Sequence, residues 1–303
     1  MKINLLDRFC RDCQMRDIKN IKTYKVYIKQ YIEMLESRSK NPNLANKDDL
    51  KDYLSGLRQR GLKPASIDKA FSCLSAFYAY MVDEELVSSN PITPFRRRYL
   101  RKYKDDNGSE SRQIISVDQA SILVNSTLNS RDKAILVLLF KTGMRLGELR
   151  HLEVDDIDHK NMTIKLKLTA KRSNRLLFFD NETEEVLQAW LQFRGKKYPN
   201  GIDALFLSRL GSRISSSAAD YVVQKHAARI GLHNPKSKCL EDRFTPHCCR
   251  HWFTTHLIRA GMPRDFVKEL RGDVRHEAID IYNHIDKKEL RESYLAHIPQ
   301  LGI

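Results

Sequence analysis

The stretch Thr245-Pro246-His247-Cys248-Cys249-Arg250-His251 predicts the start of a helix. Threonine is a favourable N-cap residue, and Pro246 suits the first helical position because its missing N–H would have no partner there. Residues three and four apart share one helix face, so His247, Arg250 and His251 should lie together. A face with imidazoles and a fixed cation, beside the positive end of a helix, favours binding of an anion such as phosphate.

Two other interpretations of this stretch stay open at this point. The histidines could make ordinary hydrogen bonds at a polar helix start. The imidazoles and thiols could also bind a metal ion, but adjacent cysteines on a helix point to different faces, and no Cys-x2-Cys pair lies nearby. We therefore expect no metal and no other cofactor, and the rest of the chain favours the anion site.

Composition points to a polyanionic partner. The chain has 303 residues, which is enough for two domains with separate cores. Its formal net charge of +15 favours nucleic acid as that partner. No apolar run is long enough to span a membrane, and the six cysteines lack the spacing of a disulfide framework. We therefore expect a protein of the reducing cytoplasm that does not associate with membranes.

The first 104 residues predict a bundle of four helices. Apolar residues recur at a spacing of 3.6 in four stripes, at 5–13, 24–35, 50–57 and 67–81. The segment has 22 Lys and Arg against 12 Asp and Glu, so it carries +10 of the total charge of +15. Lysine and arginine neutralise DNA phosphates largely without reading sequence. Residues 1–104 are therefore interpreted as a DNA clamp domain.

A linker is expected behind this bundle. Asn90-Pro91 is predicted to end the helical unit. The run from Arg96 to Lys104 is basic and contains two tyrosines, a composition that could follow a nucleic-acid backbone. The polar stretch that comes next contains glycine and serine. It places the linker at 105–113 and the second domain at 114–303.

The second domain is predicted to be rich in helices, with one small antiparallel sheet. A capping-box sequence at Ser116 starts its first helix, and the run 134–140 is apolar on all sides, which predicts a buried helix. Residues 162–168 alternate between apolar and polar, and 175–179 form the return strand of a hairpin whose tip carries a lysine. Further helices are expected at 181–191, 216–231, 263–270 and 286–297.

A second motif, Thr142-Gly143-Met144-Arg145-Leu146-Gly147-Glu148-Leu149, follows the buried helix directly. Gly143 should end that helix, so that Arg145 opens the next one beside Glu148. A guanidinium held by a carboxylate at helix spacing is oriented in advance for a phosphate. The alternative is an ordinary surface pair, which would contribute little. Lys171, at the hairpin tip, could lie in a groove of DNA.

The order of these motifs resembles the tyrosine recombinases, the family of the phage-type integrases and the Xer-type chromosome-dimer resolvases. The motifs are Thr-Gly-x-Arg-x-x-Glu-Leu, a hairpin lysine, His-x-x-Arg-His and a terminal Ile-Tyr-x-His that contains Tyr282. The resemblance covers essentially the whole chain. It implies a C-shaped clamp on double-stranded DNA, formed by a SAM-like four-helix domain at 1–104 and a catalytic domain at 114–303.

The resemblance also implies a role for each motif residue. Tyr282 would attack the scissile phosphate, form a 3′-phosphotyrosyl bond and free a 5′-hydroxyl. Arg145 and Arg250 would bind the non-bridging oxygens. His247 would serve as general acid and base, and Lys171 would give a proton to the leaving 5′-oxygen. The supporting positions would be Glu148 and His251.

The residue types alone, apart from the family resemblance, are consistent with cleavage of a phosphodiester. Cleavage of a phosphodiester develops charge on phosphate oxygens, which two arginines and a lysine can stabilise. Nearby cations also favour the ionised form of a tyrosine nucleophile. The sequence has no acidic cluster of the two-metal kind and no P-loop. We therefore expect a transesterification that needs neither metal nor ATP, because the covalent intermediate conserves the bond energy.

One departure from the family pattern concerns Asp273. Families of this kind usually have a histidine or tryptophan nine residues before the tyrosine, where this chain has an aspartate. We expect that Asp273 does not touch the phosphate, since two anions repel each other, and that it positions a basic group instead. The alternative is that Asp273 caps the helix of Tyr282. The candidate partners are Arg271, Arg275, His276 and His251.

A second departure concerns the hairpin. It is one residue shorter than the family pattern, which leaves open which basic residue of the hairpin is catalytic. Lys171 is the leading candidate. Lys167 and Arg172 stay open as alternatives.

The leading interpretation is therefore a site-specific DNA recombinase or integrase. The alternatives are a topoisomerase-like nicking and closing enzyme, which would use the same residues, and a DNA-binding protein that has lost catalysis. Exchange between two duplexes implies a homotetramer on DNA, formed by a protein that is mainly monomeric when free. The apolar residues within 287–303 could pack on their own domain or on a neighbouring protomer, and we expect the neighbour.

Overall fold

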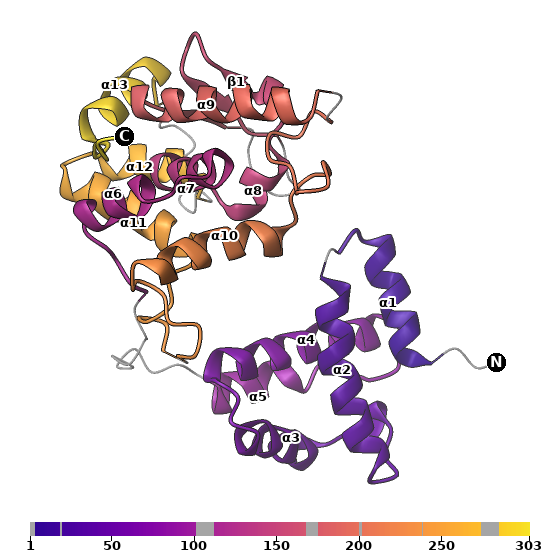
Figure 1. The fold of residues 1–303 in the computed structure, drawn as a ribbon. Helices are drawn as coiled ribbons and strands as arrows, with labels where there is room; N and C mark the ends of the chain where they lie inside the picture. Colours follow the sequence, from indigo (N-terminus) through magenta and orange to yellow (C-terminus); the bar gives the residue numbers. More distant parts are fainter. Residues whose placement is uncertain are drawn as a thin grey trace. The chain divides into compact units, whose positions relative to one another are not determined.

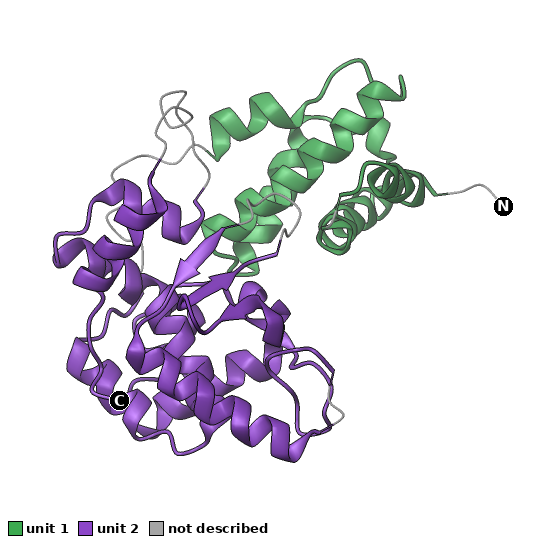
Figure 2. Cartoon of the chain, turned by 90° about the horizontal axis from the view of Figure 1, so that it is seen from above, with its two compact units in different colours: residues 1–108 green, residues 109–303 purple. Residues whose placement is uncertain are grey.

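The computed structural model describes residues 4–18, 20–100, 112–167, 175–199, 202–237, 239–273 and 285–303. The chain divides into two compact units, unit 1 at residues 1–108 and unit 2 at 109–303 (Figure 2). The described residues are mainly helical, with one small antiparallel sheet, so the predicted fold class is confirmed. Most of the expected linker, 105–113, lies outside the described residues. No helix among them is both long and apolar enough to span a membrane.

Unit 1 is a bundle of helices around an aromatic core (Figure 1). Its elements are α1 (Leu5–Met15), α2 (Ile21–Glu36), the 3₁₀ helix η1 (Pro42–Leu44), α3 (Lys47–Gln59), α4 (Pro64–Asp83) and α5 (Ile92–Tyr99). The four predicted apolar stripes lie on α1 to α4 and face the core. Phe9 of α1, for example, packs edge to face on Phe77 of α4, with 5.5 Å between the ring centroids.

The helix α5 was not predicted from the sequence. Asn90 was expected to end the bundle, but its side chain starts this fifth helix, because Oδ1 accepts a hydrogen bond from the Ile92 N–H at 3.0 Å. Phe95 then stacks on an aromatic ring of α4, with 5.3 Å between centroids. A helix this short buries only two side chains. Its apolar face is therefore hidden within a basic sequence that resembles a linker.

Unit 2 is built around the buried helix α7 (Figure 1). Its helices are α6 (Val117–Asn125), α7 (Ser130–Thr142), α8 (Leu146–His151), the 3₁₀ helix η2 (Val154–Asp156), α9 (Asn181–Lys197), α10 (Ser216–Arg229), α11 (Pro246–Arg259), α12 (Arg264–Arg271) and α13 (Lys287–His297). As predicted, every residue from Ala134 to Phe140 is fully buried. α9 and α11 pack against α7, which places the start of α11 beside the end of α7.

The turn after α7 brings two helices close together. Gly143 ends α7 with φ of 58°, a conformation that glycine adopts without strain. A Cβ atom at this position would lie only 2.3 Å from Cδ1 of Phe253 in α11. Glycine therefore both permits the turn and allows α11 to approach it. Arg145 follows as the N-cap of α8, as the sequence predicts.

The predicted hairpin is present up to its tip. The strands are β1 (Ile157–Asp158), β2 (Thr163–Lys165) and β3 (Leu176–Phe178), joined antiparallel in the order β1-β2-β3. In the register, Ile164 is opposite Leu177, and both are buried. Beyond the strands, the N–H of Leu166 donates to the Arg175 carbonyl at 3.0 Å. The tip, which contains Lys171 and Arg172, lies outside the described residues.

The C-terminal segment packs on its own unit, so the expectation that it docks on a neighbour is wrong for the single chain. The apolar residues of this segment join the core of unit 2. The reason is a buried charge: Lys141 of α7 is fully buried and needs partners. Its Nζ lies 2.6 Å from both Asp180 and Glu182, and it donates to the Pro299 carbonyl at 2.8 Å. The core residues are Leu290, Tyr294, Ile298 and Leu301.

Candidate active site

Arg145 and Arg250 come from different helices and meet at one place. Arg145 precedes α8, whereas Arg250 lies in the first turns of α11. Both donate to the main-chain carbonyl of Arg271, from Arg145 Nη1 at 3.1 Å and from Arg250 Nη2 at 2.8 Å. Two guanidiniums that share an acceptor lie side by side. The two arginines that the sequence proposes as phosphate ligands therefore belong to one cluster of charge.

Glu148 holds Arg145 from two directions. Its Oε1 accepts from Arg145 Nη1 at 3.1 Å, and its Oε2 accepts from the Arg145 main-chain N–H at 2.7 Å. Burial by itself would raise the pKa of Glu148, but hydrogen bonds and positive charge from Arg175 and Arg145 lower the pKa below the usual range. Glu148 is therefore ionised, and the expected pair is a buried, oriented one rather than a loose surface pair.

Arg175 is the site residue that sequence reasoning missed. It was interpreted only as the first residue of the return strand. Its side chain is buried and binds Glu148 with two parallel hydrogen bonds of 3.0 and 2.9 Å, while Nε donates to the Leu270 carbonyl at 3.0 Å. A Cβ on Gly272 would lie 2.3 Å from Arg175 Nη1, so glycine is needed beside the guanidinium. The available signal was an arginine directly before the apolar residues of the return strand.

Arg250 is the more deeply buried of the two arginines that are candidate phosphate ligands. Only 8% of the residue is exposed, and Nη1 donates to the Gly143 carbonyl at 2.6 Å. Burial, and then the charges of Arg145 and Arg271, lower the pKa of Arg250 to about 10. Arg250 is therefore still cationic at neutral pH. The pKa of Arg250 is lowered mainly by its burial, and the neighbouring arginines lower it further than the nearby carboxylates raise it.

Asp273 lies among the arginines of this cluster. Its Oδ1 is 3.2 Å from Arg250 Nη2 and 3.5 Å from Arg145 Nη2. Its Oδ2 is 3.2 Å from Nε of Arg271. Of the partners expected from the sequence, Arg271 is thus in place, but Arg145 and Arg250 were not among the expected partners. Of the other three candidates, Arg275 and His276 lie outside the described residues, and the contacts of Asp273 given above are with arginines rather than with His251.

His247 and His251 lie one turn apart on the exposed side of α11. Partial desolvation, followed by the charge of Arg112 and of the arginine cluster, lowers the pKa of both imidazoles. Both rings are therefore neutral at pH 7, the form that can accept a proton. The adjacent Cys248 and Cys249 point the other way and are fully buried, so the thiols and the imidazoles occupy different faces of the helix.

The remaining predicted residues are only partly covered by the structure. Tyr282, Lys171 and Arg172 lie outside the described residues, so their places in the site stay predictions. Lys167, an alternative to Lys171 as the catalytic residue of the hairpin, is described and half exposed. It forms an ion pair with Glu153 and lies 3.7 Å from Asp156. Lys167 is thus engaged with carboxylates that are not part of the arginine cluster.

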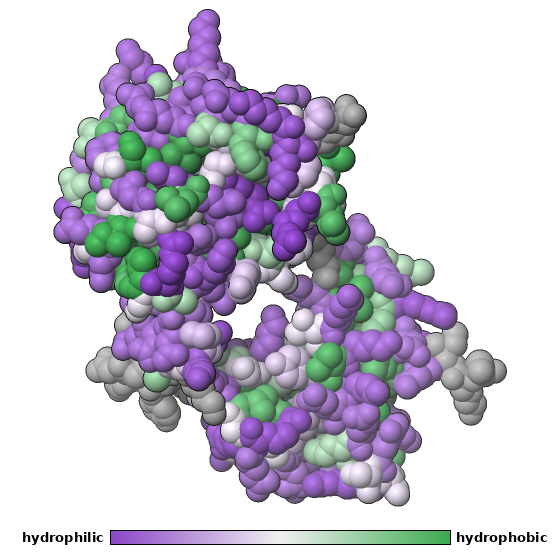
Figure 3. Space-filling model, viewed as in Figure 1, coloured by the Kyte–Doolittle hydropathy of each residue, from purple (hydrophilic) through white to green (hydrophobic). Residues whose placement is uncertain are grey.

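Unit 1 has a basic and aromatic surface of its own. A pocket of about 620 Å³ is lined by residues of α3, α5 and the turn before α5. Lys47 and Arg98 lie over the ring of Tyr99 there, with their charged groups 5.8 and 5.7 Å from its centroid. On the face seen in Figure 3, hydrophilic residues cover most of each unit and hydrophobic residues form small separate groups. Cations beside an aromatic ring suit contact with a nucleic-acid backbone.

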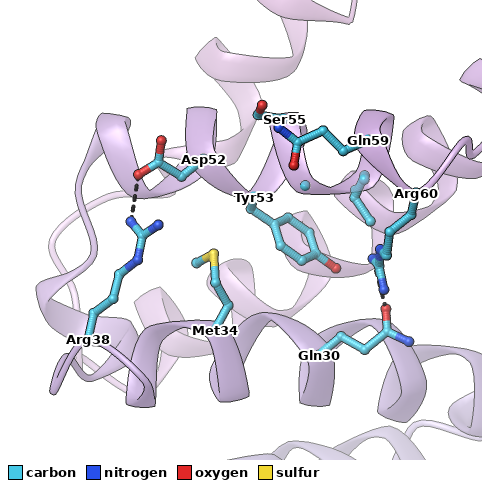
Figure 4. Close-up of a pocket in the computed structure, with 10 residues that line it drawn as sticks. Gln30, Met34, Arg38, Asp52, Tyr53, Ser55, Gln59 and Arg60 are labelled. Atoms are coloured by element: carbon cyan, nitrogen blue, oxygen red, sulfur yellow. Dashed lines mark hydrogen bonds and ion pairs between the residues drawn. The ribbon is translucent and has the colours of Figure 1, made fainter.

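A second pocket in unit 1, of about 640 Å³, lies between α2 and α3 (Figure 4). Met34 and Tyr53 face each other inside it, and two polar pairs cross its ends. Arg38 Nη1 lies 2.5 Å from Asp52, and Arg60 Nη2 donates to the amide oxygen of a glutamine of α2 at 3.5 Å. The charged residues of this pocket are thus paired across it, and they do not form a catalytic arrangement.

Comparison with protein families and known proteins gives a consistent result. The model of the phage integrase family matches residues 108–289, and the model of the phage integrase N-terminal SAM-like domain matches residues 5–87. The chain is 28% identical over 261 residues to the tyrosine recombinase XerC of Pelotomaculum thermopropionicum, which covers 82% of this chain and 79% of that protein. It is 26% identical over 277 residues to the XerC of Leptospira interrogans, covering 90% and 85%.

Solved structures share the fold. The Tn1549 transposon integrase in complex with transposon right end DNA matches with a TM-score of 0.69 and 17% identity, over 92% of this chain and 98% of that chain. A lambda integrase dimer bound to a COC′ core site matches with a TM-score of 0.67 and 17% identity, over 93% and 98%. At this level of identity, the likeness concerns the fold.

Proposed function

The chain belongs to the phage integrase family of tyrosine recombinases, and we propose that it is a site-specific DNA recombinase. It cuts and rejoins duplex DNA through a 3′-phosphotyrosyl intermediate. The reaction needs no ATP, because the phosphotyrosyl bond conserves the energy of the cleaved phosphodiester. It needs no metal, because arginines supply the positive charge that phosphoryl transfer requires.

One observation carries this proposal. Arg145 and Arg250 donate to the same carbonyl and approach the same carboxylate oxygen, so two cations from separate motifs form one anion site. Paired guanidiniums are well suited to the non-bridging oxygens of a phosphodiester. The neutral imidazole of His247 projects from the same helix as Arg250. A cationic cluster beside a proton acceptor is what cleavage by a tyrosine requires.

The proposed reaction proceeds by one displacement at phosphorus. The phenolic oxygen of Tyr282 forms a bond to the phosphorus, and the bond from phosphorus to the 5′-oxygen breaks. His247 accepts the phenolic proton, while Lys171 gives a proton to the leaving 5′-oxygen. Arg145 and Arg250 stabilise the charge on the non-bridging oxygens. Rejoining is the reverse displacement, with a 5′-hydroxyl of the partner strand as nucleophile.

The two units take separate parts in this proposal. Residues 1–104 act as the DNA clamp and 114–303 as the catalytic domain, with double-stranded DNA as partner. Support for the clamp comes from the excess of +10 charge in residues 1–104 and from the Lys47, Arg98 and Tyr99 cluster. Four protomers act together on two duplexes, and the free protein is a monomer. All six cysteines are free thiols, which suits the proposed location in a reducing cytoplasm.

The test is capture of the covalent intermediate. Duplexes that the protein binds are selected from a random-sequence pool, and nicks are then placed at successive positions, so that the cleaved fragment diffuses away and the adduct accumulates. We expect wild-type protein to form an adduct whose DNA-linked peptide contains Tyr282. The variant Tyr282→Phe should form none, with DNA affinity within about twofold of wild type, because only the nucleophilic oxygen is lost.

A matched control is Tyr221→Phe, since Tyr221 is 64% exposed in α10. This variant should form the adduct at the wild-type rate. An adduct that persists in Tyr282→Phe would reject the assignment of the nucleophile. Absence of any adduct with wild-type protein on a DNA that it binds would favour the non-catalytic DNA-binding alternative. Nicks that close without exchange between duplexes would favour the topoisomerase-like alternative.

A further inference from the structure

The anion site already contains an anion that belongs to the protein. Asp273 Oδ1 lies 3.2 Å from Arg250 Nη2 and 3.5 Å from Arg145 Nη2. The first contact is a hydrogen bond, and the second is an ion pair within the 4 Å range of carboxylate–guanidinium pairs. The side chain of Asp273 is about one-third exposed, at 33%, so it reaches this position from the solvent side rather than from the core.

The arginines do not depend on Asp273 for their orientation. Arg250 is held by the carbonyls of Gly143 and Arg271, at 2.6 and 2.8 Å. Arg145 is held by Glu148 and by the carbonyls of Arg271 and Gly272, at 3.1, 3.1 and 3.4 Å. Five acceptor contacts therefore fix the two guanidiniums independently of the aspartate. What Asp273 adds to the cluster is negative charge.

We propose that the Asp273 carboxylate occupies the phosphate position of the free protein and must leave it when the scissile phosphate binds. This inference rests on the proposed function, which brings a phosphate to Arg145 and Arg250. Two anions cannot share these N–H groups, because they would repel each other at short range. Asp273 thus acts as an internal competitor, which stabilises the cluster without DNA and weakens its affinity for phosphate.

The two possible roles of Asp273, competition with the anion and positioning of the arginines, predict opposite changes in anion affinity when Asp273 is neutralised. If Asp273 positioned the arginines, its neutralisation would weaken anion binding. If it competes with the anion, its neutralisation strengthens anion binding and makes the free protein less stable. The two effects can be measured with inorganic phosphate, which needs neither a DNA site nor turnover.

The experiment measures thermal unfolding of the full chain as orthophosphate is titrated at constant ionic strength. In Asp273→Asn, we expect the apparent dissociation constant for phosphate to fall about tenfold, and the unfolding temperature without phosphate to fall by several degrees. Saturating phosphate should close that temperature gap with wild type. Asp273→Glu keeps the charge and should bind phosphate as weakly as wild type.

Two control variants locate the effect. Asp265→Asn makes the same change in net charge on the exposed side of α12, where Asp265 is paired with Lys268, and it should leave phosphate affinity unchanged. Arg145→Gln combined with Asp273→Asn should lose the gain in affinity, because one of the two guanidiniums is gone. If Asp273→Asn does not fold, Asp273→Ser makes the same test with a smaller neutral side chain.

An unchanged or weaker phosphate affinity in the neutral Asp273 variant would overturn the inference, and so would an equal gain in Asp265→Asn. These outcomes are independent of the adduct assay. A protein that forms the Tyr282 adduct but shows no gain in phosphate affinity would retain the proposed function and reject the role of Asp273. If the neutral Asp273 variant gains phosphate affinity but the wild-type protein forms no adduct, the role of Asp273 as an internal anion is supported and the proposed catalysis is rejected.

Discussion

A series of alternating charges connects the β-hairpin to the anion site. Arg175 holds Glu148 with two hydrogen bonds, and Glu148 in turn holds the side chain and the main chain of Arg145. Each link is charge-assisted, and the first is buried. Arg175 can therefore act on the anion site without touching a phosphate, because it fixes the carboxylate that orients Arg145.

We predict that Arg175→Met destabilises unit 2 by about 3 kcal/mol, because removal of one partner leaves the buried Glu148 with less compensation. Urea unfolding of the full chain measures this change in the free energy of unfolding. Arg175→Lys keeps the charge but cannot form two parallel hydrogen bonds, so its free energy of unfolding should lie between those of the wild type and Arg175→Met. A loss below about 0.5 kcal/mol in the methionine variant would mean that Glu148 needs only Arg145.

Sequence reasoning found those residues of the site that stand beside local helix signals in the chain. The capping residue, the proline and the i+3 spacing all point to Arg145, His247 and Arg250. It missed Arg175 because the partner of Arg175 is 27 residues away. It gave only one of the three partners of Asp273, because pairing across separate helices depends on how α8, α11 and α12 pack together.

At the scale of elements, one carboxylate binds three successive main-chain amides at the end of the chain. Glu182, in the first turn of α9, accepts hydrogen bonds from the main-chain N–H groups of Leu301, Gly302 and Ile303, the shortest at 2.6 Å. The same side chain neutralises the buried Lys141. A lysine in the last turn of a core helix is thus stabilised by α9 and by the end of the chain together.

We predict that Glu182→Gln loosens this end of the chain without unfolding unit 2. Lys141 keeps Asp180 as a partner, so the loss in free energy of unfolding should be about 1–2 kcal/mol. Hydrogen exchange of the three amides should become at least tenfold faster. Glu185→Gln, an exposed change on the same helix, should leave both quantities unchanged. Equal protection in the two variants would show that apolar packing of α13 holds the segment.

The elements that were predicted well share strong local signals. The capping box of α6 is formed as predicted, with hydrogen bonds of 3.1 and 3.0 Å between Ser116 and Gln119. The buried run of α7 and the alternation of β2 also predicted their elements correctly. The helix α5 was not predicted, because its two buried apolar residues are too few to show a helical hydrophobic period within a basic run. The packing of the C-terminal segment was not predicted, because the apolar run 134–140 stops before Lys141 and nothing in the local sequence indicates that this lysine is buried.

At the scale of the whole molecule, each unit has its own core. Most of the buried apolar residues described in unit 1 form one cluster, and most of those in unit 2 form another. A domain with its own core can fold alone. The proposed division of labour between a clamp and a catalytic domain therefore has a physical basis that can be tested on the separate units.

We predict that residues 1–108 and 109–303, produced separately, each unfold in one cooperative transition. Calorimetry should show midpoints within about 5 °C of the two transitions of the full chain. In domains of this size, a shift of a few degrees corresponds to a loss of about 1 kcal/mol of stability, which is all that separation of the units should cost. Duplex DNA should bind to the isolated first unit, and high salt should weaken that binding. A unit that stays unfolded alone would show that the other one supplies part of its core.

The crowding of guanidiniums around Arg145 and Arg250 has a consequence for how the protein can change under selection. Four arginines surround two carboxylates there, so the ground state of the free protein is locally frustrated. Selection for heat resistance alone would reward additional acidic side chains near this cluster, because each would relieve repulsion. The same changes would fill the place of the substrate. Thermostable variants obtained in this way should therefore lose activity, whereas changes in the buried core of unit 2 away from this cluster carry no such trade-off.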